Sequence, residues 1–435
     1  MISINTVTVI GVTGTMGANV AGIFASFGDA KVYCVGRNIE KVKKTIPRIV
    51  KSVRADAIKD NLIAADYSML NDCIVKSDLV FESVAEDIDI KKDIAIKVGK
   101  YIKKGTISCT GSSGLSITKL AECYPEDIRH NFFGVHMFNP PYSMSLCEVI
   151  PTKYSNKTIL ESIKEYLEKR LYRTVVEVKD SPAFLGNRIG FQFINEAMQY
   201  AEKYMDNGGI DYIDSILGPF TGRMMAPLVT SDFVGLDVHK AIVDNLFYNT
   251  NDYCNDTFKL PQFVNEMISQ GFLGRKSEKG LYQTIKFDNG YKRRLVYDIK
   301  TGIYRDVIPY VFPFVEEMKK SIAEGDYKKA FSVLVNNHSQ EAEICISFLL
   351  RYIVYSIYCS GIVANNVEAA DDVMATGFNW CPPLAMYEAL STVSDVTFLI
   401  RNYIPKVLDM IDILKITNSI KESEYDYRQY FRSGR

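Results

Sequence analysis

Two residues able to move a proton, His136 and Glu148, stand twelve positions apart in a chain that has only four histidines. His136 ends an apolar run just before Asn139-Pro140-Pro141, and Glu148 lies inside a second apolar run, 146–150. If these runs form neighbouring strands, the imidazole and the carboxylate meet and make a general acid–base pair. The alternative is a strand-end histidine that bonds a backbone carbonyl, beside an unrelated glutamate at a sheet edge.

A glycine-rich turn follows the first strand-like run, 6–10, whose β-branched residues are typical of a buried parallel strand. Gly11 allows the tight turn, Gly14 lets the backbone approach a pyrophosphate, and Gly17 permits close helix packing. The loop, which includes Met16, leads into a helical pattern from about residue 18 to 27, whose N-terminus supplies amide groups and a favourable dipole for phosphate. The turn therefore predicts a dinucleotide-binding site.

The end of the second strand-like run, 31–35, bears on which dinucleotide fits. An acid there would bind the ribose 2′-OH of NAD, but the chain has Gly36 and Arg37. The planar fork of arginine suits a 2′-phosphate, so the pattern favours NADP over NAD. The alternative is a solvated arginine at a helix start, with Glu40 as its partner.

Two polar residues stand where a ligand could approach. Ser113 follows the strand-like run 105–108, at the sheet edge where ligands bind in this class of fold. A serine here either donates to a substrate oxygen or caps the helix that begins near Ser116. Asn187 stands at the entrance to a helical region, where it either reaches a substrate across a cleft or caps its own helix.

A run of basic residues follows the second strand and spans a predicted helix. Such a run is usually a solvated helix face, and binding of a phosphate-bearing carrier is the alternative. Its members are Lys41, Lys43, Lys44, Arg48, Lys51, Arg54 and Lys59.

Length and composition exclude several classes of protein. With 435 residues the chain exceeds one ordinary core, and its net charge of −1 argues against a nucleic-acid partner. The nine scattered cysteines include no CxxC pair, which favours a reducing compartment and opposes a disulfide framework or a metal site. No apolar run of membrane-spanning length and no signal peptide are apparent. We expect a cytoplasmic protein without a metal or membrane partner.

Strand-like runs alternate with helical patterns up to about residue 180, and helical periodicity dominates beyond it. The predicted fold is an α/β Rossmann-type N-terminal domain followed by an all-α C-terminal domain in two tandem repeats. We assign residues 1–180 to the dinucleotide-binding domain and 181–283 to a first helical, substrate-binding domain. Residues 284–330 are predicted to be a hairpin-bearing linker, and 331–435 a second, degenerate helical repeat.

The repeat is faint but ordered. An acidic helical segment, a glycine and then a proline-leucine pair occur in 187–235, with Pro227-Leu228, and again in 351–390, with Pro383-Leu384. Chance similarity between amphipathic helices is the alternative, and the shared proline argues against it.

Taken together, these residues resemble the 3-hydroxyacyl-CoA dehydrogenase family over almost the whole chain. The most specific part is the His-x-Phe-Asn-Pro signature at His136 with its glutamate twelve residues on. The other matching segments are 14–17, 81–86, 112–113, 180–188, 232–237, 271–276 and 280–282.

The resemblance implies roles for individual residues. His136 would take the proton of the 3-hydroxyl group, and Glu148 would orient the imidazole and stabilise its cation. Ser113 and Asn187 would bond the substrate oxygen, and Asn139 is predicted to be a further substrate-binding residue. The pair near the nicotinamide ribose would be Glu86 and Lys91.

The C-terminal repeat resembles long bacterial members with two helical modules, in which the second copy packs on the first as a partner subunit does. Arg351 stands where the first copy has Asn187, so the second copy is expected to lack catalytic residues. This organisation predicts either a monomer with an internal pseudo-dimer or a homodimer.

Three departures from the family pattern bear on specificity. Two residues separate the first two loop glycines, and the acid after the second strand is missing; both agree with NADP. Gly111 and Gly114 replace an asparagine and a serine in the serine loop, which suggests a different acyl specificity.

We therefore expect an NAD(P)-dependent enzyme that interconverts (3S)-hydroxyacyl and 3-oxoacyl thioesters, with an acyl-CoA as partner. One alternative is the same chemistry on a substrate bound to acyl carrier protein in a biosynthetic pathway. The other is a dinucleotide-binding regulatory protein without turnover.

Overall fold

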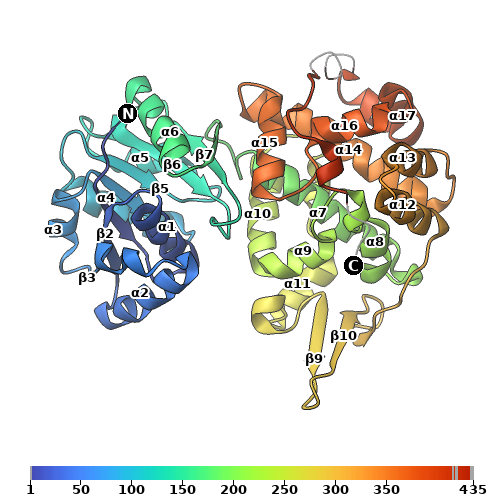
Figure 1. Cartoon of the computed structure of the whole chain (residues 1–435), viewed down its shortest axis with the longest axis horizontal. Helices are drawn as coiled ribbons and strands as arrows, with labels where there is room; N and C mark the ends of the chain where they lie inside the picture. The colour runs from blue at the N-terminus through green and yellow to red at the C-terminus, as the bar shows by residue number, and fades with distance from the viewer. Residues whose placement is uncertain (1, 414–415, 417–419, 432–435) are drawn as a thin grey trace. The chain divides into compact units, whose positions relative to one another are not determined.

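The computed structural model of the protein describes residues 2–413, 416 and 420–431. The chain forms two compact units, Met1–Phe184 with Val363–Asn365, and Leu185–Ile362 with Asn366–Arg435 (Figure 1). The first unit thus ends four residues after the predicted boundary at 180. It also includes a short distant segment, because Lys179 donates its backbone N–H to Val363 and Val178 bridges to Ala364. The last four residues of the predicted second repeat, 432–435, lie outside the described residues.

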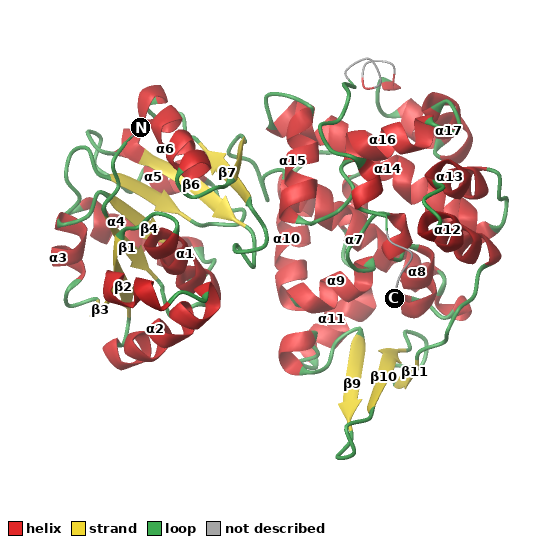
Figure 2. Ribbon diagram, in the orientation of Figure 1, coloured by secondary structure: helices red, strands yellow, loops and turns green. Residues whose placement is uncertain are grey.

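The first unit is built on an eight-stranded sheet with the order β3-β2-β1-β4-β5-β6-β7-β8 (Figure 2). Every neighbouring pair is parallel except β6 and β7, which are antiparallel. The strands are β1 Thr6–Ile10, β2 Lys31–Gly36, β3 Leu62–Asp66, β4 Leu79–Glu82, β5 Ile107–Thr110, β6 Phe132–Met137, β7 Leu146–Ile150 and β8 Thr174–Glu177. The helices are α1 Thr15–Ser26, α2 Ile39–Val53, α3 Leu70–Val75, α4 Ile88–Gly99, α5 Ile117–Ala121 and α6 Lys157–Lys169. The predicted Rossmann-type domain is confirmed.

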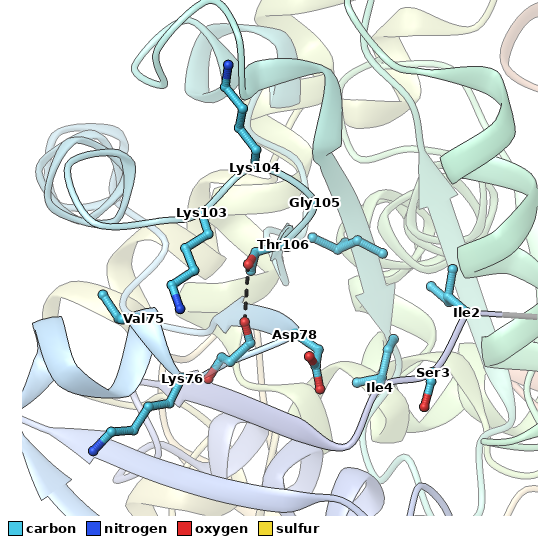
Figure 3. Close-up of a pocket in the computed structure, with 12 residues that line it drawn as sticks. Ile2, Ser3, Ile4, Val75, Lys76, Asp78, Lys103, Lys104, Gly105 and Thr106 are labelled. Atoms are coloured by element: carbon cyan, nitrogen blue, oxygen red, sulfur yellow. Dashed lines mark hydrogen bonds between the residues drawn. The ribbon is translucent and has the colours of Figure 1, made fainter.

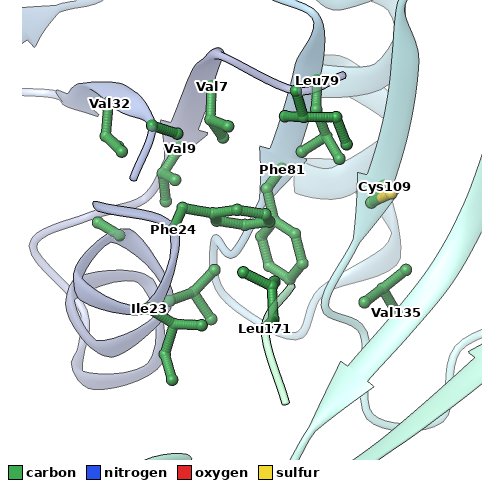
Figure 4. Close-up of a cluster of buried hydrophobic side chains, with 14 of the residues drawn as sticks. Val7, Val9, Ile23, Phe24, Val32, Leu79, Phe81, Cys109, Val135 and Leu171 are labelled. Carbon is green, nitrogen blue, oxygen red and sulfur yellow. The ribbon is translucent and has the colours of Figure 1, made fainter. Parts of the chain in front are cut away.

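The core of this unit lies between the sheet and its covering helices (Figure 4). Val7 and Val9 of β1 are fully buried, as expected for a central parallel strand. Phe24 of α1 packs edge-to-face on Phe81 of β4, with ring centroids 6.0 Å apart. This packing fixes α1 against the strands whose carboxyl ends carry the site.

The second unit is mainly helical. Its helices are α7 Gly186–Lys203, α8 Ile210–Ile216, α9 Pro227–Val234, α10 Leu236–Asn249, α11 Gln262–Ser269, α12 Pro313–Ala323, α13 Tyr327–Val335, α14 Gln340–Val363, α15 Glu368–Gly377, α16 Pro383–Ser391 and α17 Val396–Tyr403. A three-stranded sheet, β9 Tyr282–Lys286, β10 Lys292–Tyr297 and β11 Tyr304–Asp306, separates α11 from α12.

The segment 284–330 is more structured than the predicted linker. It holds most of the three-stranded antiparallel sheet, and α12 and the first residues of α13 follow within it. The hairpin was foreseen because the turn at Asp288-Asn289-Gly290 is clear. The helices were not predicted. Proline usually indicates the end of a helix, but Pro313 occupies the first turn of α12, where proline is tolerated.

Each of the two parts that the sequence pairs as repeats contains an equivalent buried hydrogen bond. The carboxylate of Asp214 accepts from the N–H of Leu228 at 2.8 Å, and that of Asp371 accepts from Leu384 at 2.8 Å. In both places the amide lies in the first turn of a helix that begins with proline. Burial raises the pKa of each carboxyl to about 7.

Side chains from the two parts also interlock. The Arg223 guanidinium is buried, with its Cζ 3.8 Å from the ring centroid of Phe193 and 4.8 Å from that of Trp380. Arg351 of α14 forms an ion pair with Glu196 of α7 at 2.9 Å. The second part therefore covers the first through cation–aromatic and ionic contacts as well as apolar ones.

One described helix, α14, has the length and composition of a membrane span, although the sequence showed no uninterrupted apolar run of that length. In the structure, 78% of its apolar window is buried inside the protein. Helices buried in a protein core have the same composition.

Candidate active site

His136 and Glu148 are directly opposite each other on the antiparallel strands β6 and β7. The His136 Nδ1 atom lies 2.8 Å from Glu148 Oε2, and the two residues are 5% and 0% exposed. A carboxylate accepts, so Nδ1 carries the proton and Nε2 keeps the lone pair that a base needs. The partner of Nδ1 is thus the carboxylate and not a backbone carbonyl.

The surroundings of the pair are aromatic. The rings of Phe138 and Phe184 lie 4.6 and 5.6 Å from the imidazole, measured between centroids. His239, a buried histidine of the second unit, has no carboxylate as hydrogen-bond partner in the described structure, and burial lowers its pKa to about 3. It bonds Ser231 and Asn195 and stays neutral, so its role is structural.

The glycine loop between β1 and α1 fits a dinucleotide pyrophosphate. Gly11 has φ +90°, and a Cβ there would lie 2.3 Å from the Ser83 carbonyl oxygen. A Cβ at Gly17 would lie 2.4 Å from the Gly11 oxygen, so α1 packs directly on the loop. Gly14 is the N-cap of α1 and offers no side-chain acceptor to the first-turn amides, Met16 among them. Those amides and the helix dipole are suited to phosphate.

The end of β2 lies beside this loop. A Cβ at Gly36 would touch Thr13 of the loop and Val42 of α2, so only glycine fits there without adjustment. Arg37 follows it and is exposed. Glu40, the acid that could have neutralised Arg37, pairs instead with Lys43 at 2.9 Å.

The serine loop after β5 is tied to α4 through acidic residues. Glu86 Oε1 accepts from Ser112 Oγ at 2.6 Å and from the Ser113 N–H at 2.7 Å. The buried Lys91 Nζ lies 3.4 Å from Glu86 Oε2 and 2.9 Å from Glu82 Oε1. The structure therefore joins three predicted residues, Ser113, Glu86 and Lys91, in one network.

Glu82 and Thr110 complete that network and were not predicted. Glu82 ends β4, is buried, and accepts from Thr110 Oγ1 at 2.6 Å and from the Val84 N–H. The available signal was a charged residue at the end of an apolar strand, at the edge where ligands bind.

Ser113 does not cap α5. Ser116 is the N-cap, and Asp180 accepts from the Ile117 and Thr118 N–H groups at 2.9 and 2.8 Å. The helix start is thus satisfied without Ser113, whose side chain is half-buried.

Two models of one protein family match successive parts of the chain. The NAD-binding domain of 3-hydroxyacyl-CoA dehydrogenase matches residues 6–181, and the C-terminal domain of the same family matches 184–284. A probable 3-hydroxyacyl-CoA dehydrogenase of Deinococcus radiodurans is 31% identical over 64% of this chain and 83% of its own length. One of Bacillus subtilis is 29% identical over 72% of this chain, which spans only 39% of that relative.

The chain belongs to the 3-hydroxyacyl-CoA dehydrogenase family. Its first unit is the NAD-binding domain, and the protein is an NAD(P)-dependent oxidoreductase.

The fold of the family is shared over nearly the whole chain. The structure of 3-hydroxybutyryl-CoA dehydrogenase from Escherichia coli matches 95% of this chain and 98% of its own, with a TM-score of 0.69 and 19% identity. (S)-3-hydroxybutyryl-CoA dehydrogenase from Ralstonia eutropha matches 64% of this chain and 98% of its own, with a TM-score of 0.56 and 28% identity.

Two predicted residues of this dehydrogenase are not joined to His136 by a hydrogen bond in the structure. Asn139 follows β6 and accepts from Asn19 Nδ2 of α1 at 3.3 Å. Asn187 belongs to the second unit, where it is buried in the first turn of α7. It is not the cap of that helix, because the N-cap position is Leu185.

Alanine substitutions at Gly14 and at Gly17 should separate two functions of the glycine loop, the binding of the pyrophosphate and the close packing of α1. Gly17→Ala forces the loop apart and is expected to cost about 1–3 kcal/mol of unfolding free energy as well as cofactor affinity. Gly14→Ala meets only Gly11 O at 3.4 Å, so the fold should persist while the dissociation constant for NADH rises about tenfold or more. Thermal melting and NADH fluorescence titration measure both. If Gly14→Ala binds NADH as the wild type does, the backbone at Gly14 does not approach the pyrophosphate.

A separate cavity of about 560 Å³ lies at the opposite, amino-terminal edge of the sheet (Figure 3). Lys76, Lys103 and Lys104 line it, and Thr106 Oγ1 bonds the Ser77 carbonyl at its wall at 3.1 Å. It contains none of the predicted site residues and lies away from the ligand-binding edge.

Proposed function

We propose that the protein interconverts (3S)-hydroxyacyl and 3-oxoacyl thioesters of coenzyme A with NAD(P). The observation that carries the proposal is the buried His136–Glu148 hydrogen bond at the end of β6. The relative from Deinococcus radiodurans, of which this chain spans most of the length, bears the name of this activity.

In the oxidative direction, His136 Nε2 accepts the proton of the 3-hydroxyl group as the C3–O double bond forms. Glu148 stabilises the imidazolium that results. Bound NAD(P)⁺ supplies the acceptor for the hydride that leaves C3. Ser113 donates a hydrogen bond to the substrate oxygen, and the Glu82–Lys91–Glu86 network holds the Ser113 backbone in place.

Acetoacetyl-CoA reduction, assayed in parallel with NADH and NADPH, tests the activity. We expect saturable oxidation of the reduced cofactor. Tight cofactor binding without turnover of any CoA thioester would favour the regulatory alternative. Turnover of carrier-protein thioesters alone would favour the biosynthetic one.

The altered serine loop gives little support to a different carrier. A Cβ at Gly111 would lie 3.0 Å from the ring of Phe81, so packing against that ring accounts for glycine here. Coenzyme A therefore stays the carrier that we propose.

We also propose that NADP is preferred over NAD, on the strength of the exposed Arg37 beside the glycine loop. Arg37→Ser should lower kcat/KM for NADPH about tenfold or more and leave that for NADH nearly unchanged, since a phosphate partner is lost. Arg170→Ser, which changes an exposed arginine at the end of α6, is the matched control. A loss that is equal for both cofactors would show that Arg37 does not read the 2′-phosphate.

The second helical part is proposed to be a non-catalytic copy of the first. Arg351 takes the place of Asn187 and is committed to Glu196 of α7. The copy would bury the surface that a partner subunit covers in shorter relatives. We also propose a cytoplasmic location, because the nine cysteines, most of them buried, form no disulfide in the described part of the chain.

A further inference from the structure

A second cleft, of about 900 Å³, lies within the helical unit and is lined by residues of α9 and of the β9–β10 hairpin. Figure 1 labels these three elements. Its lining includes four basic side chains, Arg275, Lys286, Lys292 and Arg294, and two acidic ones, Asp232 and Glu278. Both oxygens of Asp232 accept backbone N–H groups, those of Leu281 and Tyr282. Positive charge is therefore in excess in this basic cleft.

The strand register concentrates that charge. Lys286 is directly opposite Lys292, and Arg294 is opposite Thr284, in the antiparallel pair β9–β10. Residues two apart on a strand share a face, so Lys286, Lys292 and Arg294 point to the same side. Like charges directly opposite each other destabilise a strand pair. The hairpin thus carries an unfavourable arrangement on the face that lines the cleft.

Basic residues just outside the cleft are neutralised. Arg293, on the other face of β10, binds Asp306 at 2.7 Å, and Lys276 lies 2.6 Å from Asp237. In the described part of the chain, by contrast, none of the four basic side chains of the cleft forms an ion pair. Burial raises the pKa of Asp214 to about 7 and that of Asp232 to about 6, and Arg294 opposes this rise only from longer range.

Aromatic rings accompany the charges. Phe233 is 45% exposed in the cleft, and the Arg275 guanidinium carbon lies 5.4 Å from its ring centroid. The Arg294 guanidinium lies 4.1 Å from the ring centroid of Tyr282. Exposed aromatic faces beside arginine are suited to stacking with a nucleobase, while lysines suit phosphate.

We propose that this cleft is a binding site for a nucleoside polyphosphate, separate from the dinucleotide loop of the first unit. Lys286, Lys292 and Arg294 bind the phosphates, and the base stacks on Phe233. The inference does not rest on the proposed function, because the lining of the cleft includes none of the residues assigned to the reaction or to the glycine loop.

The test is calorimetric titration of ATP into the full-length protein saturated with NAD⁺, so that the glycine loop is already occupied. We expect saturable binding that Lys286→Ser with Lys292→Ser weakens about tenfold or more. The double variant Lys259→Ser with Lys320→Ser changes the charge equally at exposed positions, and its affinity should stay near that of the wild type. Equal affinity of the two double variants, or no binding by the wild type, overturns the proposal.

Two further arms test the chemistry of the ligand. Tripolyphosphate that binds as tightly as ATP would refute the base contact, and adenosine that does so would refute the phosphate contact. The double variant Lys286→Ser with Lys292→Ser also removes the repulsion between these lysines, so its melting temperature should be unchanged or higher.

If this variant loses ATP binding and also melts at a lower temperature, the loss reflects damaged folding. The single variant Phe233→Ser then decides: the proposal stands only if this variant binds ATP more weakly and tripolyphosphate as tightly as the wild type.

Discussion

Replacing His136 with glutamine is expected to lower kcat for acetoacetyl-CoA reduction about 10²–10⁴-fold, the usual contribution of a positioned general acid–base group. Glutamine has a similar length and still bonds Glu148, but it does not exchange a proton near neutral pH. KM for the thioester should change little, because the imidazole acts on the reacting oxygen and does not bind the carrier. Steady-state rates at saturating cofactor measure the effect.

His130→Gln is the matched control. His130 lies in the short helical turn 129–131 before β6, whereas His136 is near the carboxyl end of that strand, so the His130 side chain has no expected part in the reaction. Its variant should retain nearly full activity. Near-normal kcat in His136→Gln, with an intact fold by circular dichroism, would remove His136 from the mechanism and with it the basis of the proposed function.

Much of the first unit could be predicted from local pattern. β1 begins and ends at the predicted residues, 6–10, because the β-branched and apolar side chains of a central parallel strand are unambiguous. β5 was predicted at 105–108 but runs over 107–110, since Gly105 adopts φ +93° and belongs to the preceding turn. β3 was missed because two alanines weaken its strand pattern, and its pairing with β2 decides its conformation.

The part of the site that could be predicted is the pair of acid–base residues that lie on two strands paired with each other. His136 and Glu148 could be placed together because two short apolar runs joined by a proline turn usually pair. The capping question at Ser113 could not be answered, because the decisive residue, Asp180, lies 64 positions from Ser116. The role of Glu82 was equally hidden, since its burial against Lys91 follows from the packing of α4 on the sheet.

Glu148→Gln should lower kcat for oxidation of a (3S)-hydroxyacyl-CoA about 10²–10⁴-fold although Glu148 does not touch the substrate, because a carboxylate that orients a catalytic histidine contributes up to that much in serine proteases. A glutamine amide can donate to Nδ1, which moves the imidazole proton to Nε2 and blocks the position that must accept. It also fails to stabilise the imidazolium. The size and hydrogen-bonding capacity of the buried side chain are kept, so the melting temperature should change less than kcat.

The decisive measurement is the double variant His136→Gln with Glu148→Gln. If Glu148 acts only through His136, the double variant loses about as much activity as His136→Gln alone, and the two single losses do not multiply. Glu122→Gln, which changes an exposed glutamate, controls for the loss of charge. Multiplicative losses in the double variant would show that Glu148 acts on the substrate or the cofactor directly, and the imidazole would then need another source of its orientation.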